Sequence, residues 1–190
     1  MKALMLYNTQ SGHGLITKYI DKIVEIFRNE NIELHPQLIE FDKSPFEDYK
    51  SVDLVGVCGG KGKINFVVNK MREAGINPML GIIPAGTAND FAGALGMPRN
   101  ILKAARKIAT GREHKVDCGC VNNSYFVNVL SFGVLTTTSQ QTSDREKHIM
   151  GKLAYVRVGL KDLHRMHRIP LHVKSTTFMP KIVSPVTTPK

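Results

Sequence analysis

The feature that most constrains this fold is a recurring order in which an apolar run is followed by a polar or glycine-containing turn and then by an amphipathic segment. Apolar runs at residues 2–7, 52–58 and 79–86 each begin such a unit, and residues 32–41 offer one further strand. The run VDLVGVC at 52–58 is almost continuously apolar, which is typical of a parallel strand covered on both faces. Strands that alternate with helices at this spacing predict an open, mostly parallel α/β sheet.

Helical periodicity follows these turns. The first two apolar stripes at helical spacing consist of Ile16, Ile20, Ile23, Val24 and Phe27, and of Ile64, Val67, Val68 and Met71. Gly75 is expected to end the second helix, and Gly96 to close a short third one. Asn100 and Gly111 are the expected cap and stop of a fourth helix, because asparagine and glycine favour these positions.

A different pattern begins near Asp117. Residues 115–122 and 124–134 read as two strands joined through Asn122 and Asn123. Asparagine tolerates the backbone conformation of tight hairpin turns, so this stretch predicts a hairpin instead of a crossover through a helix.

The length and these changes of pattern suggest how the chain is divided. At 190 residues it has room for one domain with a sizeable core and part of a second. We expect an α/β domain at 1–122 and a second architecture at 123–175. The tail at 176–190 is rich in Ser, Thr and Pro, which predicts disorder.

The charge of the chain indicates an anionic partner. Lysine and arginine outnumber aspartate and glutamate by 26 to 16, for a formal net charge of +10, so nucleotide, nucleic acid and lipid headgroups are candidates. No nucleic acid is expected, because no binding motif is present and only 7% of residues are aromatic, which leaves few platforms for base stacking. The basic stretch at 160–174, with interleaved apolar residues, suits an anionic membrane surface, although a solvated helix face is the commoner meaning of such a run.

The sequence favours a cytoplasmic location. Its first residues lack a signal-peptide core, and no apolar run approaches the roughly 20 residues that a membrane span needs. Cys58, Cys118 and Cys120 are odd in number and form no C-x-x-C pair, so we expect reduced thiols on buried strands.

The glycine-rich turn after residue 58 suits a phosphate. Ligands of open α/β sheets bind at the carboxyl ends of the strands. The absence of side chains at Gly59, Gly60 and Gly62 lets a phosphate approach the backbone N–H groups at the start of the next helix. The spacing matches neither common phosphate-loop pattern, so an ordinary tight turn is an equally good interpretation.

The segment IIPAGTANDFAGALGMP at 82–98 resembles the region that follows the G-G-D-G-T loop in the diacylglycerol kinase catalytic-domain family, and the bacterial lipid kinases of that family are the nearest likeness. YNTQSG at 7–12, residues 116–133 and residues 151–163 are also similar to family motifs. Motif order and spacing are kept from residue 1 to about 175. Several motifs in the right order are more specific than any one of them.

This resemblance implies an ATP-dependent lipid kinase. The α/β nucleotide-binding domain would be followed by a β-sandwich domain, incomplete here, with ATP between them. The γ-phosphoryl group would pass to a lipid hydroxyl such as that of diacylglycerol, with Mg²⁺ as cofactor. The enzyme would be peripheral at an anionic membrane surface.

The resemblance also assigns residues to the site. The first phosphate loop would contain Asn8, Ser11 and Gly12, the second Gly59, Gly60 and Gly62, and the third Gly86, Thr87, Asn89 and Asp90. Asp117 matches an aspartate linked through water to the magnesium. The catalytic residues remain unknown, since the family's general base lies beyond residue 190.

Simpler roles remain open for several of these residues. Asp90 suits the cap of the short helix, and Asn8 and Ser11 suit a turn. Asp117 is flanked by apolar residues, and burial of a carboxylate requires a partner, so a structural partner is as good an explanation as a metal-bound water.

The chain departs from the family where Lys61 replaces the aspartate and Lys63 the threonine of G-G-D-G-T. An anion thereby becomes a cation, so catalysis by the usual route should suffer. Lysine can still meet a phosphate as a point charge, although two solvated lysines without a role are also possible. The alternative function is therefore an inactive nucleotide- or membrane-binding relic. Uncovered sheet edges further suggest a homo-oligomer.

Overall fold

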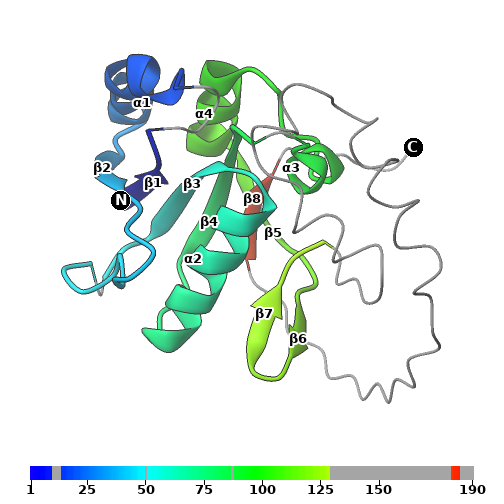
Figure 1. The fold of residues 1–190 in the computed structure, drawn as a ribbon. Coiled ribbons are helices and arrows are strands. Elements are labelled where there is room, and N and C mark those ends of the chain that lie inside the picture. Colours follow the sequence, from blue (N-terminus) through cyan, green and yellow to red (C-terminus); the bar gives the residue numbers. More distant parts are fainter. Residues whose placement is uncertain (10–13, 50, 87, 129–180, 185–190) are drawn as a thin grey trace. The chain divides into compact units, whose positions relative to one another are not determined.

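The structure is a computed structural model that describes residues 1–9, 14–49, 51–86, 88–128 and 181–184 (Figure 1). The chain forms two compact units. Residues 1–128 and 176–190 make up the first unit, and residues 129–175 make up the second, which lies outside the described residues. The expected β-sandwich therefore falls almost entirely outside the part of the chain described here.

A six-stranded sheet forms the centre of the first unit. Five of its strands run parallel, and the last strand pairs antiparallel at one edge. In sheet order the strands are β2 (Glu33–Leu38), β1 (Lys2–Tyr7), β3 (Leu54–Gly59), β4 (Met79–Pro84), β8 (Lys181–Ser184) and β5 (Arg112–Lys115). The prediction of an open, mostly parallel α/β sheet is confirmed.

Helices cover both faces of this sheet. Their bounds are Ile16–Asn29 for α1, Lys61–Glu73 for α2, Asp90–Ala94 for α3 and Ile101–Thr110 for α4. The connection through α1 leads from β1 to one side, and the connection through α2 leads from β3 to the other, so right-handed crossovers place the two helices on opposite faces. Helix α4 packs beside α1, as Figure 1 shows.

The apolar core lies where the sequence pattern predicts it. All six residues of β3 are buried, as expected for a parallel strand between two helix layers. Helix α1 buries Ile16, Ile23 and Phe27, and the whole predicted stripe of α2 is buried. The amphipathic periodicity therefore identified the inner face of both helices.

Local signals also set the helix ends. The Asn100 side chain accepts a hydrogen bond from the Lys103 N–H at 3.0 Å, so it is the N-cap of α4. Gly75 and Gly96 follow the ends of α2 and α3 with φ angles of +66° and +67°, a conformation that glycine adopts at little cost.

The predicted hairpin consists of β6 (Gly119–Val121) and β7 (Ser124–Phe126). Asn122 and Asn123 connect the strands with φ angles of +47° and +63°, as a type I′ turn requires at both central positions. The hairpin lies within the first compact unit, whose first segment runs from Met1 to Asn128, although we expected a domain boundary between residues 122 and 123.

Two strands were not expected from the sequence. Strand β5, with the sequence REHK, is a mostly exposed edge strand and shows no apolar alternation. Strand β8 lies in the tail that we expected to be disordered, and it pairs with both β4 and β5. Residues 181–184 of that tail thus form a strand, where Ile182 and Val183 interrupt the Ser-, Thr- and Pro-rich composition with residues that favour strands.

Candidate functional site

The candidate site lies at the carboxyl edge of the parallel sheet, between β1 and β3. The connection that follows β1 leads to one side of this point, and the connection that follows β3 leads to the other. Such a switch point is where open α/β sheets bind ligands. Asn8 follows β1 and is half-buried, Gly60 follows β3, and Gly86 lies just after β4. Since Gly59 pairs with Pro84 in the β3–β4 register, the second and third predicted loops leave the sheet side by side.

The two glycine loops touch through their backbones. A Cβ atom built on Gly86 would lie 2.6 Å from the Cα and 2.8 Å from the N of Gly60. Real Cβ atoms do not approach backbone this closely, so only glycine fits at Gly86 without displacing a loop. The structure thus brings together two predicted site residues that are 26 positions apart in the chain.

Asn89 closes the third loop. The Gly86 N–H donates to Asn89 Oδ1 at 2.8 Å, and Asn89 Nδ2 donates to the Gly86 carbonyl oxygen at 2.7 Å. Asn89 is also the N-cap residue of α3 and has a φ angle of +57°, which asparagine tolerates better than most residues. In the structure its amide therefore holds the loop backbone, a role that we did not expect from the sequence.

The other predicted loop residues are only partly placed. Asp90 is exposed and is the first residue of α3, so it is not the cap that its sequence position suggested. Ser11, Gly12 and Thr87 lie outside the described residues.

The N-terminus of α2 combines a glycine N-cap with two lysines, and its Lys63 N–H donates to the Gly60 carbonyl oxygen at 3.1 Å. Gly60 is its N-cap residue in an extended conformation, no side chain caps the helix, and its first turn contains no acidic residue. Lys61 is exposed, whereas the stem of Lys63 folds back over Gly59, with its Cδ 2.6 Å from where a Gly59 Cβ would lie. Two cations near the positive end of a helix dipole repel it unless an anion binds there.

Asp117 is exposed just before β6. Asp117 is therefore not a buried carboxylate that requires a partner. Among the described residues, no group of three or more His, Cys, Asp or Glu side chains could hold a metal ion. A carboxylate that contacts a metal only through water is compatible with this arrangement.

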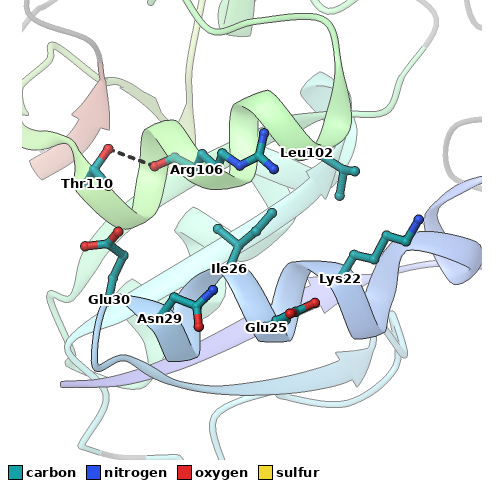
Figure 2. Close-up of a pocket in the computed structure, with 8 residues that line it drawn as sticks. All are labelled: Lys22, Glu25, Ile26, Asn29, Glu30, Leu102, Arg106 and Thr110. Carbon is teal, nitrogen blue, oxygen red and sulfur yellow. Dashed lines mark hydrogen bonds between the residues drawn. The ribbon is translucent and has the colours of Figure 1, made fainter.

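A hollow of about 470 Å³ lies elsewhere, on the helix layer between α1 and α4 (Figure 2). Figure 2 shows Ile26 and Lys22 on the α1 side of the hollow and Leu102 and Arg106 on the α4 side. None of its lining residues belongs to the predicted phosphate loops. We therefore do not identify this hollow with the candidate site.

The cysteines differ in exposure, which predicts their reactivity. All three are reduced; Cys58 and Cys118 are buried as expected, whereas Cys120 is exposed. Burial raises the pKa of the Cys58 thiol far above its ordinary value, and burial also raises the pKa of Cys118.

We expect iodoacetamide at pH 8 to modify Cys120 first, and to modify Cys58 only in denaturant, because the thiolate is the reactive form. Peptide mass spectrometry after alkylation would measure this order. The raised pKa also means that Cys58 stays protonated in the folded state and ionises once unfolded, so the free energy of unfolding should fall as the pH rises above about 8.5. Labelling of Cys58 as fast as of Cys120 would contradict the expectation.

The fold and the site define a class: doubly wound α/β proteins whose glycine loops meet at the carboxyl edge of a parallel sheet. Residues 2–121 match the family model described as the diacylglycerol kinase catalytic domain. The chain therefore belongs to the diacylglycerol kinase catalytic-domain family, and the resemblance found in its motifs is confirmed.

Curated relatives and solved structures agree with this assignment. The diacylglycerol kinase of Bacillus subtilis is 35% identical over 168 residues, which are 85% of this chain and 55% of the relative. The diacylglycerol kinase of Staphylococcus carnosus is 33% identical over 181 residues, with 91% and 58% covered. A crystal structure of a diacylglycerol kinase from Bacillus anthracis matches 67% of this chain and 50% of its own, with 31% identity and a TM-score of 0.58. The chain thus spans a little over half the length of the curated relatives it matches.

Proposed function

We propose that this chain forms the nucleotide-binding part of an ATP-dependent lipid kinase, which transfers the γ-phosphoryl group of ATP to a lipid hydroxyl such as that of diacylglycerol. The observation that carries the proposal is the backbone contact between Gly60 and Gly86 at the carboxyl edge of the sheet. In a member of the diacylglycerol kinase catalytic-domain family, such a contact supports a role for both loops around the phosphates.

The chemistry of the loop supports phosphate binding. At α2 the Lys63 N–H donates to the Gly60 carbonyl oxygen at 3.1 Å. The N–H groups before it have no partner within the helix, and the N-cap residue Gly60 has no side chain that could accept from them. A phosphate oxygen would accept hydrogen bonds from these groups, and Lys61 would add a point charge. The same anion would relieve the repulsion between the two lysines and the helix dipole.

Magnesium fits the proposal as an ion carried by the nucleotide. Mg²⁺ keeps several waters and is commonly held by one or two carboxylates together with substrate phosphates. Asp117 is the carboxylate that would contact it through water. When bound, the ion would neutralise charge on the phosphoryl oxygens.

The second candidate is an inactive relic that binds a nucleotide or a membrane. The observation that favours it is the pair of lysines in the first turn of α2, where no acidic residue is present. Peripheral association with an anionic membrane is part of both candidates, and the net charge of +10 supports it. None of the described helices is long and apolar enough to cross a bilayer.

Titration calorimetry of ATP with and without Mg²⁺ would test the proposal, on the unaltered chain and on a variant with Lys61→Asp and Lys63→Thr. We expect Mg²⁺-dependent binding by the unaltered chain and tighter binding by the variant, because an acid beside the nucleotide can help to hold the metal. A matched control, Lys103→Asp with Lys107→Thr on α4, changes the charge equally at two exposed positions. It should bind ATP as the unaltered chain does.

The outcomes separate the two candidates. Mg²⁺-dependent binding by the unaltered chain, followed by phosphorylation of diacylglycerol in mixed micelles, would support the kinase. Binding only by the variant with Lys61→Asp and Lys63→Thr would favour the inactive relic. Absence of binding in both would show that the proposal is wrong.

A further inference from the structure

Two asparagines of α2 bind the backbone of strand β7 and of Val127, the residue that follows it. Asn65 Oδ1 accepts a hydrogen bond from the Val127 N–H at 2.9 Å, and Asn69 Oδ1 accepts one from the Tyr125 N–H at 2.8 Å. Asn69 Nδ2 donates to the carbonyl oxygens of Tyr125 and Asn65, both at 2.7 Å. Three backbone groups of one strand segment are thus bound by side-chain amides from a helix.

The amides replace a neighbouring strand. In an antiparallel pair the N–H and C=O groups of alternate residues point to the same side. Tyr125 and Val127 are alternate residues, and their bonds to α2 lie on the edge of β7 that faces away from β6. A side-chain amide carries the same donor and acceptor groups as a peptide bond, so it can satisfy this edge.

Other contacts add to this docking. The Arg72 guanidinium lies over the Tyr125 ring, 5.2 Å from its centroid, which is a cation–π distance. Val127 is completely buried. Hydrogen bonds to a buried backbone group are costly to lose, so the hairpin should not leave α2 readily.

We call the hydrogen bonds from Asn65 and Asn69 to the backbone of Tyr125 and Val127 the clamp. The clamp connects two parts of the proposed site. Asn65 lies one helical turn after Lys61, close to the phosphate loop at the start of α2. On the hairpin, Gly119 of β6 pairs with Phe126 of β7, and Cys118 Sγ donates to the Phe126 carbonyl oxygen at 3.2 Å. Asp117 precedes this buried cysteine directly.

We propose that Asn65 and Asn69 are positioning residues, which hold the β6–β7 hairpin on α2 and thereby fix Asp117 relative to the Gly60 loop. The part that concerns Asp117 rests on the proposed function, whereas the clamp itself does not. Neither asparagine is a catalytic residue, because both act through the backbone of β7.

The two asparagines use their amides differently, and this gives a sharp test. Asn65 binds Val127 through its oxygen alone, so Asn65→Asp keeps the acceptor. Asn69 uses both ends of its amide, so Asn69→Asp loses the donor and places a carboxylate beside two carbonyl oxygens. A generic loss of packing would not distinguish the two aspartate variants in this way.

Amide hydrogen exchange followed by NMR on the full chain without ligand is the first measurement. Asn65→Ala should accelerate exchange of the Val127 amide by about tenfold or more, because a buried donor loses its partner. Asn65→Asp should restore protection to within about twofold of the unaltered chain. Asn69→Asp keeps the acceptor for the Tyr125 N–H but repels the two carbonyl oxygens, so it should accelerate exchange at Tyr125, by less than Asn69→Ala does. The control is Asn77→Ala, at an exposed position beyond α2, which should change neither amide.

Several results would overturn the inference. Unchanged exchange in Asn65→Ala, or equal exchange for the two aspartate variants, would show that the amides do not hold β7. If Asn69→Asp fails to fold, the comparison of Asn65→Ala with Asn65→Asp still decides the matter.

Affinity for Mg²⁺-ATP tests the link to Asp117. This affinity should fall about tenfold in Asn69→Ala, because the substitution removes more than one hydrogen bond that holds the hairpin. It should stay unchanged in Asn77→Ala. Fast exchange with unchanged affinity would overturn the positioning of Asp117. Absence of ATP binding by the unaltered chain would instead show that the proposed function is wrong, and the exchange rates alone would then decide whether the clamp exists.

Discussion

Replacing Gly86 with alanine is expected to push the two glycine loops apart and to lower the free energy of unfolding by about 1–3 kcal/mol, the usual cost of overpacking. The added methyl group would meet the Gly60 backbone at 2.6 Å and Asn89 Oδ1 at 3.1 Å. A backbone cannot rotate away as a flexible side chain can. The hydrogen bonds between Gly86 and Asn89 should therefore be strained as well, and affinity for Mg²⁺-ATP should fall with the stability.

Denaturation in urea and calorimetry with ATP would measure both effects. Gly62→Ala is the matched control for stability alone, because nothing lies within 4 Å of a Cβ at this helical position. Alanine is favoured over glycine in a helix, so this variant should be up to about 1 kcal/mol more stable. If Gly86→Ala is as stable as Gly62→Ala and binds ATP as well as the unaltered chain does, the contact between the loops does not organise the site.

Phe27→Ala should have the largest effect on stability, a loss of about 3–5 kcal/mol. The Phe27 side chain is 1% exposed and lies on the inner face of α1. Its removal eliminates apolar burial and leaves a cavity beneath the helix. Because a domain is typically stable by only about 5–15 kcal/mol, this variant should be partly unfolded near physiological temperature.

The midpoint of thermal unfolding, followed by circular dichroism, would test this expectation. Arg28→Ala, at the next and exposed position of α1, should change the free energy of unfolding by no more than about 0.5 kcal/mol. A loss below about 1 kcal/mol in Phe27→Ala would mean that α1 does not pack on the sheet as described.

The departures at Lys61 and Lys63 divide the family's properties into two groups. Backbone features of the loop, namely its glycines and its contact with Gly86, do not depend on which side chains stand at the lysine positions. The charge and the hydrogen-bonding groups of the loop do depend on these side chains, since a carboxylate and a hydroxyl are replaced by two cations. Binding of phosphate and catalysis should therefore respond differently to these two residues.

The sequence alone determined the helices, the strands other than β5 and β8, and several of the element ends. Periodicity identified the inner faces of α1 and α2, and Asn100 and the Asn122–Asn123 pair marked a cap and a turn. These signals involve residues up to about four positions apart, so the local chain is sufficient to express them. They also placed the candidate loops at the carboxyl ends of β3 and β4.

Tertiary structure decided what those loops contact. The contact of Gly60 with Gly86, the hydrogen bonds of Asn89 to the Gly86 backbone, and the exposure of Asp117 depend on how strands and loops assemble. The position of Asn65 and Asn69, two polar residues next to the apolar stripe of α2, was the one feature of the sequence that could have indicated their contacts.

Pairing between distant segments was also decided by the tertiary structure. Edge strand β5 has no apolar alternation, because an edge position does not require burial on both faces. Strand β8 pairs with β4, about 100 positions earlier in the chain. The bonds from Asn65 and Asn69 likewise span 62 and 56 positions. Local sequence cannot determine such contacts, because their energy is gained only when the rest of the fold brings both partners together.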